Sequence, residues 1–120
     1  MSKVLIVDDS LTVRMYHRQI LQKAGFECDE AENGMEALEK AQFNKYDLYV
    51  VDINMPVLDG YSFVKRLREG EAPLAPIIMV STESEAKDMD LAFESGASVY
   101  LIKPARPDDL ILNAKMLTRA

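Results

Sequence analysis

Short apolar runs alternate with amphipathic stretches along the whole chain. The runs have the length and character of buried strands, and the stretches between them carry apolar residues at helical spacing. Strands are predicted over residues 3–7, 27–31, 47–52, 76–81 and 98–102. Helices are predicted over about 10–24, from 34 onward, after 60 to about 69, over 85–95 and from 107 onward. This repeated alternation predicts an α/β protein with a five-stranded parallel sheet, doubly wound so that helices cover both of its faces.

The residues that punctuate these segments support the assignment. Asp9 or Ser10 can cap the first helix, Gly25 ends it, and Pro107 suits the first turn of the last helix. The segment 27–31 alternates in polarity, which suits an edge strand. In the second helix the residues expected to face inward are Met35, Leu38 and Ala41.

Composition narrows the class of protein. The 120 residues fit one domain, expected to span 1–120, and the content of 48% hydrophobic and 28% charged residues is that of an ordinary globular protein. A net charge of −6 argues against direct binding to nucleic acid or to an anionic membrane, and no apolar stretch is long enough to span a bilayer. Cys28 is the only cysteine, which favours a reducing, cytoplasmic setting and a buried thiol.

Charged residues follow three of the predicted strands directly. Asp8 and Asp9 follow the first strand, Asp52 ends the third, and Lys103 follows the fifth. The carboxyl ends of parallel strands share one edge of the sheet, where ligands of open α/β sheets bind. Two carboxylates about 4 Å apart repel by roughly 4 kcal/mol at an effective dielectric near 20, so three of them require a hard cation such as Mg²⁺. The pattern therefore predicts a site for a divalent cation and a phosphoryl group.

Four segments carry a resemblance to a known family. They read VDDS at 7–10, VDINMPVLDG at 51–60, IIMVS at 77–81 and YLIKP at 100–104. In this order and at these spacings the chain resembles, over its whole length, the receiver domain of two-component response regulators. The resemblance implies a flavodoxin-like fold with the sheet order 2-1-3-4-5.

The resemblance also implies a phosphoacceptor and a metal site. Asp52 is expected to accept the phosphoryl group. Asp9 and Asp52 are expected to ligate Mg²⁺ directly, Asp8 mainly through water, and Asn54 through its backbone carbonyl, with Mn²⁺ as a possible substitute.

Further roles follow from the same resemblance. Lys103 is expected to pair with Asp52 or its phosphate, and the Lys103–Pro104 peptide bond to be cis. Ser81 is expected to donate its hydroxyl to the phosphoryl group, while Tyr100 is expected to turn inward when Ser81 moves. A static, half-buried Tyr100 is the alternative. Thr82 departs from the small residue usual at its position and narrows the approach to the site.

Three more polar residues lie at positions where a role in or near the site is conceivable, namely Asn54, Glu83 and His17. Asn54 and Glu83 lie two residues after the aspartate and the serine of the site, where their side chains can tune dephosphorylation. His17 lies at helical spacing with apolar neighbours, so it is expected to be a packed, hydrogen-bonded core residue rather than a metal ligand.

The expected function is that of a single-domain response regulator in a phosphorelay, possibly in chemotaxis or motility. A histidine kinase, a phosphotransfer protein or a small phosphodonor phosphorylates Asp52. The face made by the fourth helix, fifth strand and fifth helix then binds a protein target, the domain acting as a monomer or a phosphorylation-dependent dimer. Because its product is a conformation, it is not expected to be an enzyme. The alternatives are a phosphatase with an aspartyl nucleophile and an interaction module independent of phosphorylation.

Overall fold

The computed structural model describes residues 2–119, in which five strands and five helices alternate. The strands are β1 (Lys3–Val7), β2 (Glu27–Ala31), β3 (Leu48–Asp52), β4 (Ile77–Ser81) and β5 (Val99–Ile102). The helices are α1 (Leu11–Lys23), α2 (Gly34–Phe43), α3 (Gly60–Glu69), α4 (Ala86–Ser95) and α5 (Pro107–Thr118). The first and last residues of the expected domain, 1 and 120, lie outside the described residues. Strands β3, β4 and β5 each begin one residue later than the sequence pattern predicts, which is within the usual uncertainty of strand ends.

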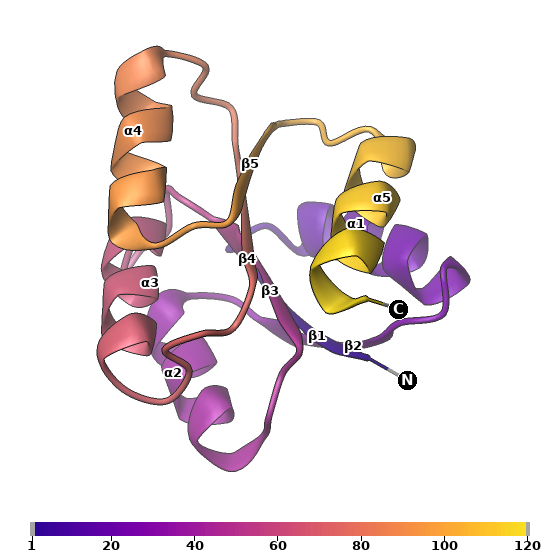
Figure 1. The fold of residues 1–120 in the computed structure, drawn as a ribbon, viewed down its shortest axis with the longest axis horizontal. Coiled ribbons are helices and arrows are strands. Elements are labelled where there is room, and N and C mark those ends of the chain that lie inside the picture. Colours follow the sequence, from indigo (N-terminus) through magenta and orange to yellow (C-terminus); the bar gives the residue numbers. More distant parts are fainter. Residues whose placement is uncertain (1, 120) are drawn as a thin grey trace.

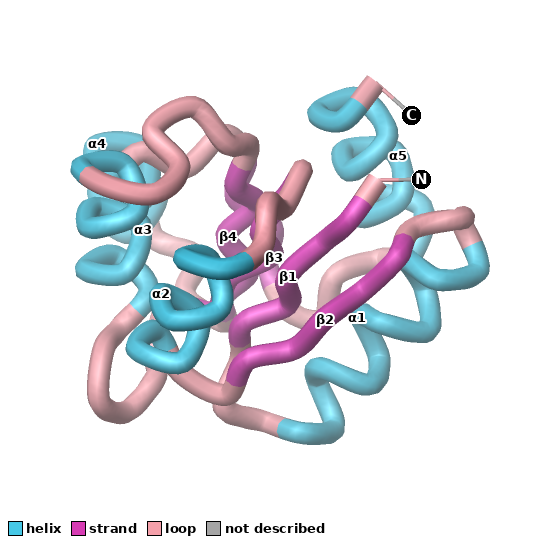
Figure 2. The backbone as a smooth tube through the Cα atoms, turned by 90° about the horizontal axis from the view of Figure 1, so that it is seen from below, coloured by secondary structure: helices cyan, strands magenta, loops and turns pink. Residues whose placement is uncertain are grey.

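All strand pairs are parallel, and the sheet order is β2-β1-β3-β4-β5. Helices α1 and α5 cover one face of the sheet, and α2, α3 and α4 cover the other (Figure 1). Figure 2 shows β2 at the edge of the sheet, beside β1. The predicted α/β class, the doubly wound arrangement and the 2-1-3-4-5 order are confirmed.

The sheet separates two hydrophobic clusters. In β1, Leu5 and Val7 pack toward α2, α3 and α4, whereas Val4 and Ile6 pack toward α1 and α5. Strand β3 is buried along its whole length, while the edge strand β5 is only partly buried. Continuous burial on both faces explains why the central strands are unbroken apolar runs.

Helix starts are fixed by side-chain caps. The Ser10 hydroxyl accepts a hydrogen bond from the N–H of Val13, so Ser10 and not Asp9 caps α1. Asn33 and Asp59 cap α2 and α3 in the same way. Asp9 is not the cap and lies exposed at the edge of the sheet.

The expected inward face of α2 is wrong in one residue. Met35 is 44% exposed, and the covered stripe of α2 consists of Gly34, Ala37, Leu38 and Ala41. Those four positions repeat at helical spacing, and Met35 lies about 100° around the helix from Gly34.

Gly60 allows α3 to start directly against the end of β3. A Cβ atom on Gly60 would lie 2.3 Å from the carbonyl oxygen of Asp52 and 2.8 Å from the Cα of Ile53. The N–H of Gly60 donates to the carbonyl of Ile53 at 2.8 Å. This close approach holds the backbone that carries Asp52.

Candidate functional site

Three carboxylates meet at the carboxyl edge of the sheet. Oxygen atoms of Asp8, Asp9 and Asp52 lie within 4.8 Å of one another. Strands β1 and β3 are neighbours with Val7 opposite Val51, so the residues that follow, Asp8 and Asp52, end side by side. Asp8 and Asp52 are buried and Asp9 is exposed, so the cluster opens to solvent on one side.

Lys103 reaches this cluster from the far side of β4. Its Nζ lies 2.8 Å from Oδ2 of Asp8 and 3.0 Å from Oδ1 of Asp52. The ammonium of Lys103 therefore bridges two of the three acids. The peptide bond between Lys103 and Pro104 is cis.

The electrostatics of the site follow from burial and charge. Burial raises the pKa of Asp52, and the nearby carboxylates of Asp8 and Asp9 raise it further, against the lowering effect of Lys103. For Lys103 burial disfavours the ammonium, but the hydrogen bonds to Asp8 and Asp52 outweigh it and raise the pKa. One ammonium thus compensates only part of the negative charge of three carboxylates.

The backbone of Asp8 is held by a residue that sequence reasoning missed. The Nη1 of Arg14 donates to the carbonyl of Asp8 at 2.7 Å, and its Nε donates to Oε1 of Glu30 at 2.9 Å. Glu30 also accepts from Arg18 at 2.6 Å. Burial of Glu30 favours its protonated form, but these hydrogen bonds outweigh burial and lower its pKa. The contact between α1 and β2 depends on tertiary packing, so no local signal in the sequence indicates it.

Ser81 and Tyr100 are joined through the backbone of Glu83. Ser81 is buried at the end of β4, and its Oγ accepts from the N–H of Glu83 at 3.1 Å. The hydroxyl of Tyr100 donates to the carbonyl of Glu83 at 2.7 Å, and its ring is half-buried. Tyr100 thus fastens β5 to the loop between β4 and α4 in this state.

The remaining expected site residues lie around the rim. Asn54, Thr82 and Glu83 are all exposed. Thr82 also borders a hollow shared with Lys103 and with α1. Their placement leaves these side chains accessible to water and to a partner.

His17 is buried, as expected, but its expected hydrogen bonding is wrong. Its Nδ1 has no hydrogen-bond partner within residues 2–119. Desolvation by burial lowers the pKa of His17 to about 4, in spite of the opposing charge of Asp8. The ring is therefore neutral at physiological pH and serves as a core residue of α1.

The donor set suits a hard divalent cation. Three carboxylates supply oxygen ligands, and the open side at Asp9 leaves room for water molecules. Mg²⁺ binds proteins through one or a few carboxylates while it keeps several waters. The residues present thus fit the acidic metal-binding pocket of the family suggested by the sequence.

The comparisons with known proteins decide the family. The family model for the response regulator receiver domain matches residues 4–115. The chain belongs to this family. Receiver domains are signalling modules of two-component systems, and their partners are histidine kinases or phosphotransfer proteins.

Relatives of this receiver domain include longer proteins. The transcriptional regulatory protein ResD of Bacillus subtilis is 37% identical over 118 residues, which are 98% of this chain and 48% of ResD. The transcriptional regulatory protein SrrA of Staphylococcus aureus matches with the same identity and coverage. The chain thus spans about half the length of the curated relatives it matches.

Among solved structures, the receiver domain is similar to a chemotaxis response regulator and to another receiver domain. The chemotaxis response regulator CheY4 of Vibrio cholerae has a TM-score of 0.91 and 38% identity, with 98% of both chains covered. The Francisella response regulator 1452 receiver domain has a TM-score of 0.93 and 32% identity, covering 99% of this chain and 98% of that one. Within residues 2–119 no helix is both long and apolar enough to cross a bilayer.

Proposed function

We propose that this receiver domain, extending over residues 1–120, is phosphorylated on Asp52 by a histidine kinase, a phosphotransfer protein or a small phosphodonor. The observation that carries the proposal is the approach of three carboxylates to within 4.8 Å, with Lys103 bridging Asp8 and Asp52. Asp9, Asp52 and the backbone carbonyl of Asn54 would hold Mg²⁺ or Mn²⁺, and Asp8 would act mainly through water. The bound cation supplies positive charge that neutralises the carboxylates and the transferring phosphoryl oxygens.

The geometry of Asp52 suits nucleophilic attack on phosphorus. Lys103 occupies Oδ1, and within residues 2–119 no hydrogen bond engages Oδ2. Oδ2 forms the new bond to phosphorus while the bond from phosphorus to the donor's nitrogen or oxygen breaks and the donor leaves with that electron pair. The phosphoaspartate carries a charge of roughly −2, and the ammonium of Lys103 compensates part of it.

The switch proposed for the phosphorylated state begins at Ser81. When Ser81 turns to donate its hydroxyl to the phosphoryl group, its Oγ moves away from the N–H of Glu83, and loss of this contact releases the segment that holds Tyr100. Tyr100 then turns inward. The face made by α4, β5 and α5 changes shape as a result.

The α4-β5-α5 face is proposed to bind the protein target. Its three elements carry exposed large apolar side chains, namely Leu91, Phe93, Ile102, Leu112 and Met116. Exposed large apolar side chains are common in protein-binding surfaces. Similarity to CheY4 favours a target in chemotaxis or motility, reached by protein contact in the cytoplasm and not by direct nucleic-acid binding. The domain works as a monomer or a phosphorylation-dependent dimer.

The lifetime of the phosphate on Asp52 is proposed to depend on the exposed residues around the site, Asn54, Thr82 and Glu83. Asn54 and Glu83 are exposed and can orient water toward the phosphoaspartate, and Thr82 restricts access to it. The domain promotes its own phosphorylation and dephosphorylation, but its output is a conformation, so we do not class it as an enzyme.

Intact-mass spectrometry after incubation with acetyl phosphate and Mg²⁺ tests the proposal. The wild-type protein is expected to gain the mass of one phosphoryl group and Asp52→Asn none. Asp90→Asn is the matched control, because Asp90 is exposed on α4 and forms no ion pair within residues 2–119. An unmodified wild type, or equal labelling of Asp52→Asn, would refute the assignment. Release of phosphate from phosphomonoesters would instead support the phosphatase alternative.

A further inference from the structure

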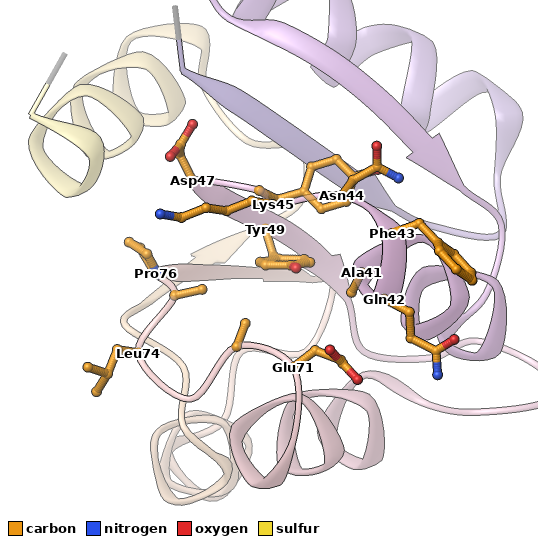
Figure 3. A pocket seen from close by; sticks show the side chains of 13 residues that line it. Ala41, Gln42, Phe43, Asn44, Lys45, Asp47, Tyr49, Glu71, Leu74 and Pro76 are labelled. Atoms are coloured by element: carbon orange, nitrogen blue, oxygen red, sulfur yellow. The ribbon is translucent and has the colours of Figure 1, made fainter.

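A second hollow lies at the opposite edge of the sheet from the acidic cluster. It measures about 590 Å³ and lies between the segment 41–47, which comprises the end of α2 and the link to β3, and the segment 71–76, which links α3 to β4 (Figure 3). Tyr49 of β3 also lines it. Tyr49 precedes Asp52 by three positions, a distance of about 10 Å along β3. The two sites are therefore distinct.

Tyr49 contributes a buried polar group to this hollow. The residue is 1% exposed, and its ring packs against Tyr46 and Phe63 at centroid distances of 5.5 and 6.0 Å. No hydrogen bond within residues 2–119 involves its hydroxyl, and this oxygen is not one of the fully enclosed polar atoms, so it borders the open space of the hollow. Burial, and then the charge of Glu71, raises the pKa of Tyr49 to about 12, so the hydroxyl keeps its proton. A hydroxyl that borders a hollow in this way is available to a bound ligand.

The charges that border the hollow are separated. Figure 3 shows Glu71 and Lys45 on different sides of Tyr49, with Lys45 extending on the side of Asp47. Glu71 is exposed and forms no salt bridge within residues 2–119. Asp47 accepts a hydrogen bond from the backbone N–H of Lys3. The free carboxylate of Glu71 therefore favours a cation on its side of the hollow.

Apolar groups complete the walls and the rim. Ala72, Ala75 and Pro76 line the wall, and the rim carries Phe43, which is 82% exposed, and Leu74, which is 92% exposed. Large apolar side chains exposed to this degree beside a hollow are typical of surfaces that a protein partner covers.

We propose that this hollow binds an arginine-bearing apolar segment of a partner protein. The guanidinium donates to the Glu71 carboxylate and to the hydroxyl oxygen of Tyr49. Its aliphatic stem lies against the alanine wall, and apolar neighbours in the segment cover Phe43 and Leu74. The volume, which is in the range that holds drug-sized ligands, accommodates more than one side chain.

Two further features favour arginine. A planar guanidinium can bind a carboxylate through two parallel hydrogen bonds and still donate to a neighbouring hydroxyl, which a lysine ammonium does with less fixed geometry. The net charge of −6 on the whole chain attracts a cationic segment.

NMR titration of the unphosphorylated full chain tests this inference. The probe is the peptide acetyl-Phe-Arg-Leu-amide, and its matched neutral analogue has citrulline in place of arginine. We expect saturable amide shifts confined to residues 41–49 and 71–76, with binding about tenfold tighter for the arginine peptide than for the citrulline peptide.

Variants then separate specific binding from general attraction. Glu71→Gln is expected to weaken binding of the arginine peptide by about tenfold, so that the arginine and citrulline peptides bind equally well. Glu69→Gln removes the same charge two residues away, outside the lining, and is expected to bind as the wild type does. Absence of shifts, equal binding of the two peptides, or equal loss in both variants would overturn the proposal. Asp52→Asn is expected to bind the peptide as tightly as the wild type does. The peptide result therefore does not depend on whether Asp52 is phosphorylated.

Discussion

Replacing Asp52 with asparagine is expected to stabilise the fold when no divalent cation is present. Oxygen atoms of Asp52 lie within 4.8 Å of those of Asp8 and Asp9, so each of the two repulsions amounts to about 3.5 kcal/mol at an effective dielectric of 20. The attraction to Lys103 at 3.0 Å amounts to about 5.5 kcal/mol on the same scale. Removal of the charge thus leaves the variant more stable by about 1.5 kcal/mol.

The pH dependence of this effect has a definite sign. The pKa of Asp52 is raised in the folded protein, so the folded state holds its proton more tightly than the unfolded state does. The wild type therefore loses stability relative to Asp52→Asn as the pH rises from the unfolded pKa through the raised folded pKa. The advantage of Asp52→Asn is expected to be absent at lower pH and complete above that range.

Urea unfolding in EDTA and in excess MgCl₂ measures both effects. Mg²⁺ at 100 times its dissociation constant stabilises the wild type by about 2.7 kcal/mol, so the order of stability is expected to reverse when the cation is added. Asp90→Asn removes the same formal charge from an exposed site. It is expected to change the free energy of unfolding by no more than about 0.5 kcal/mol, both in EDTA and in MgCl₂. A less stable Asp52→Asn in EDTA, or an advantage that Mg²⁺ does not reduce, would refute the reasoning.

Other expected outcomes follow from individual contacts. Arg68→Met removes hydrogen bonds to carbonyl groups of the α3–β4 loop and the α4–β5 turn, and urea unfolding is expected to show a loss of about 2–4 kcal/mol. Gly60→Ala places a Cβ against the carbonyl of Asp52, and a loss of at least about 2 kcal/mol is expected together with slower phosphorylation by acetyl phosphate. Glu30→Gln is expected to lower stability at pH 7. Because the pKa of Glu30 is lowered in the folded protein, the ionised carboxylate stabilises the fold fully above the unfolded pKa, and this stabilisation disappears as the pH falls through the folded pKa. Unfolding curves of both proteins between neutral and acidic pH measure the loss. Thr82→Ala is expected to shorten the lifetime of the phosphorylated form, measured as loss of label after the phosphodonor is removed.

Each of these outcomes can fail in its own way. An Arg68→Met protein as stable as the wild type would show that water replaces the lost donors. A Gly60→Ala protein with normal stability and phosphorylation would mean that α3 can shift without cost. A stability difference for Glu30→Gln that stays constant on acidification, or an unchanged decay rate for Thr82→Ala, would contradict the corresponding argument.

Much of the architecture could be predicted because burial leaves a local pattern. An apolar run must be covered on both faces, and an amphipathic stretch must turn its apolar stripe to the sheet. Once the strands are parallel, their carboxyl ends share an edge, so the meeting of Asp8, Asp9 and Asp52 follows from sequence order. Lys103 joins them because it follows the last strand of the same sheet.

Other features were decided only by tertiary structure, because they depend on how one element approaches another. The choice of Ser10 as the cap, the exposure of Met35 and the contact between Arg14 and Glu30 each require the orientation of a helix relative to its neighbours. The hollow beside Tyr49 arises where two loops distant in sequence leave a gap at the amino edge of the sheet. Periodicity reports which residues are covered, but the partner that covers them is determined by the packing of the whole chain.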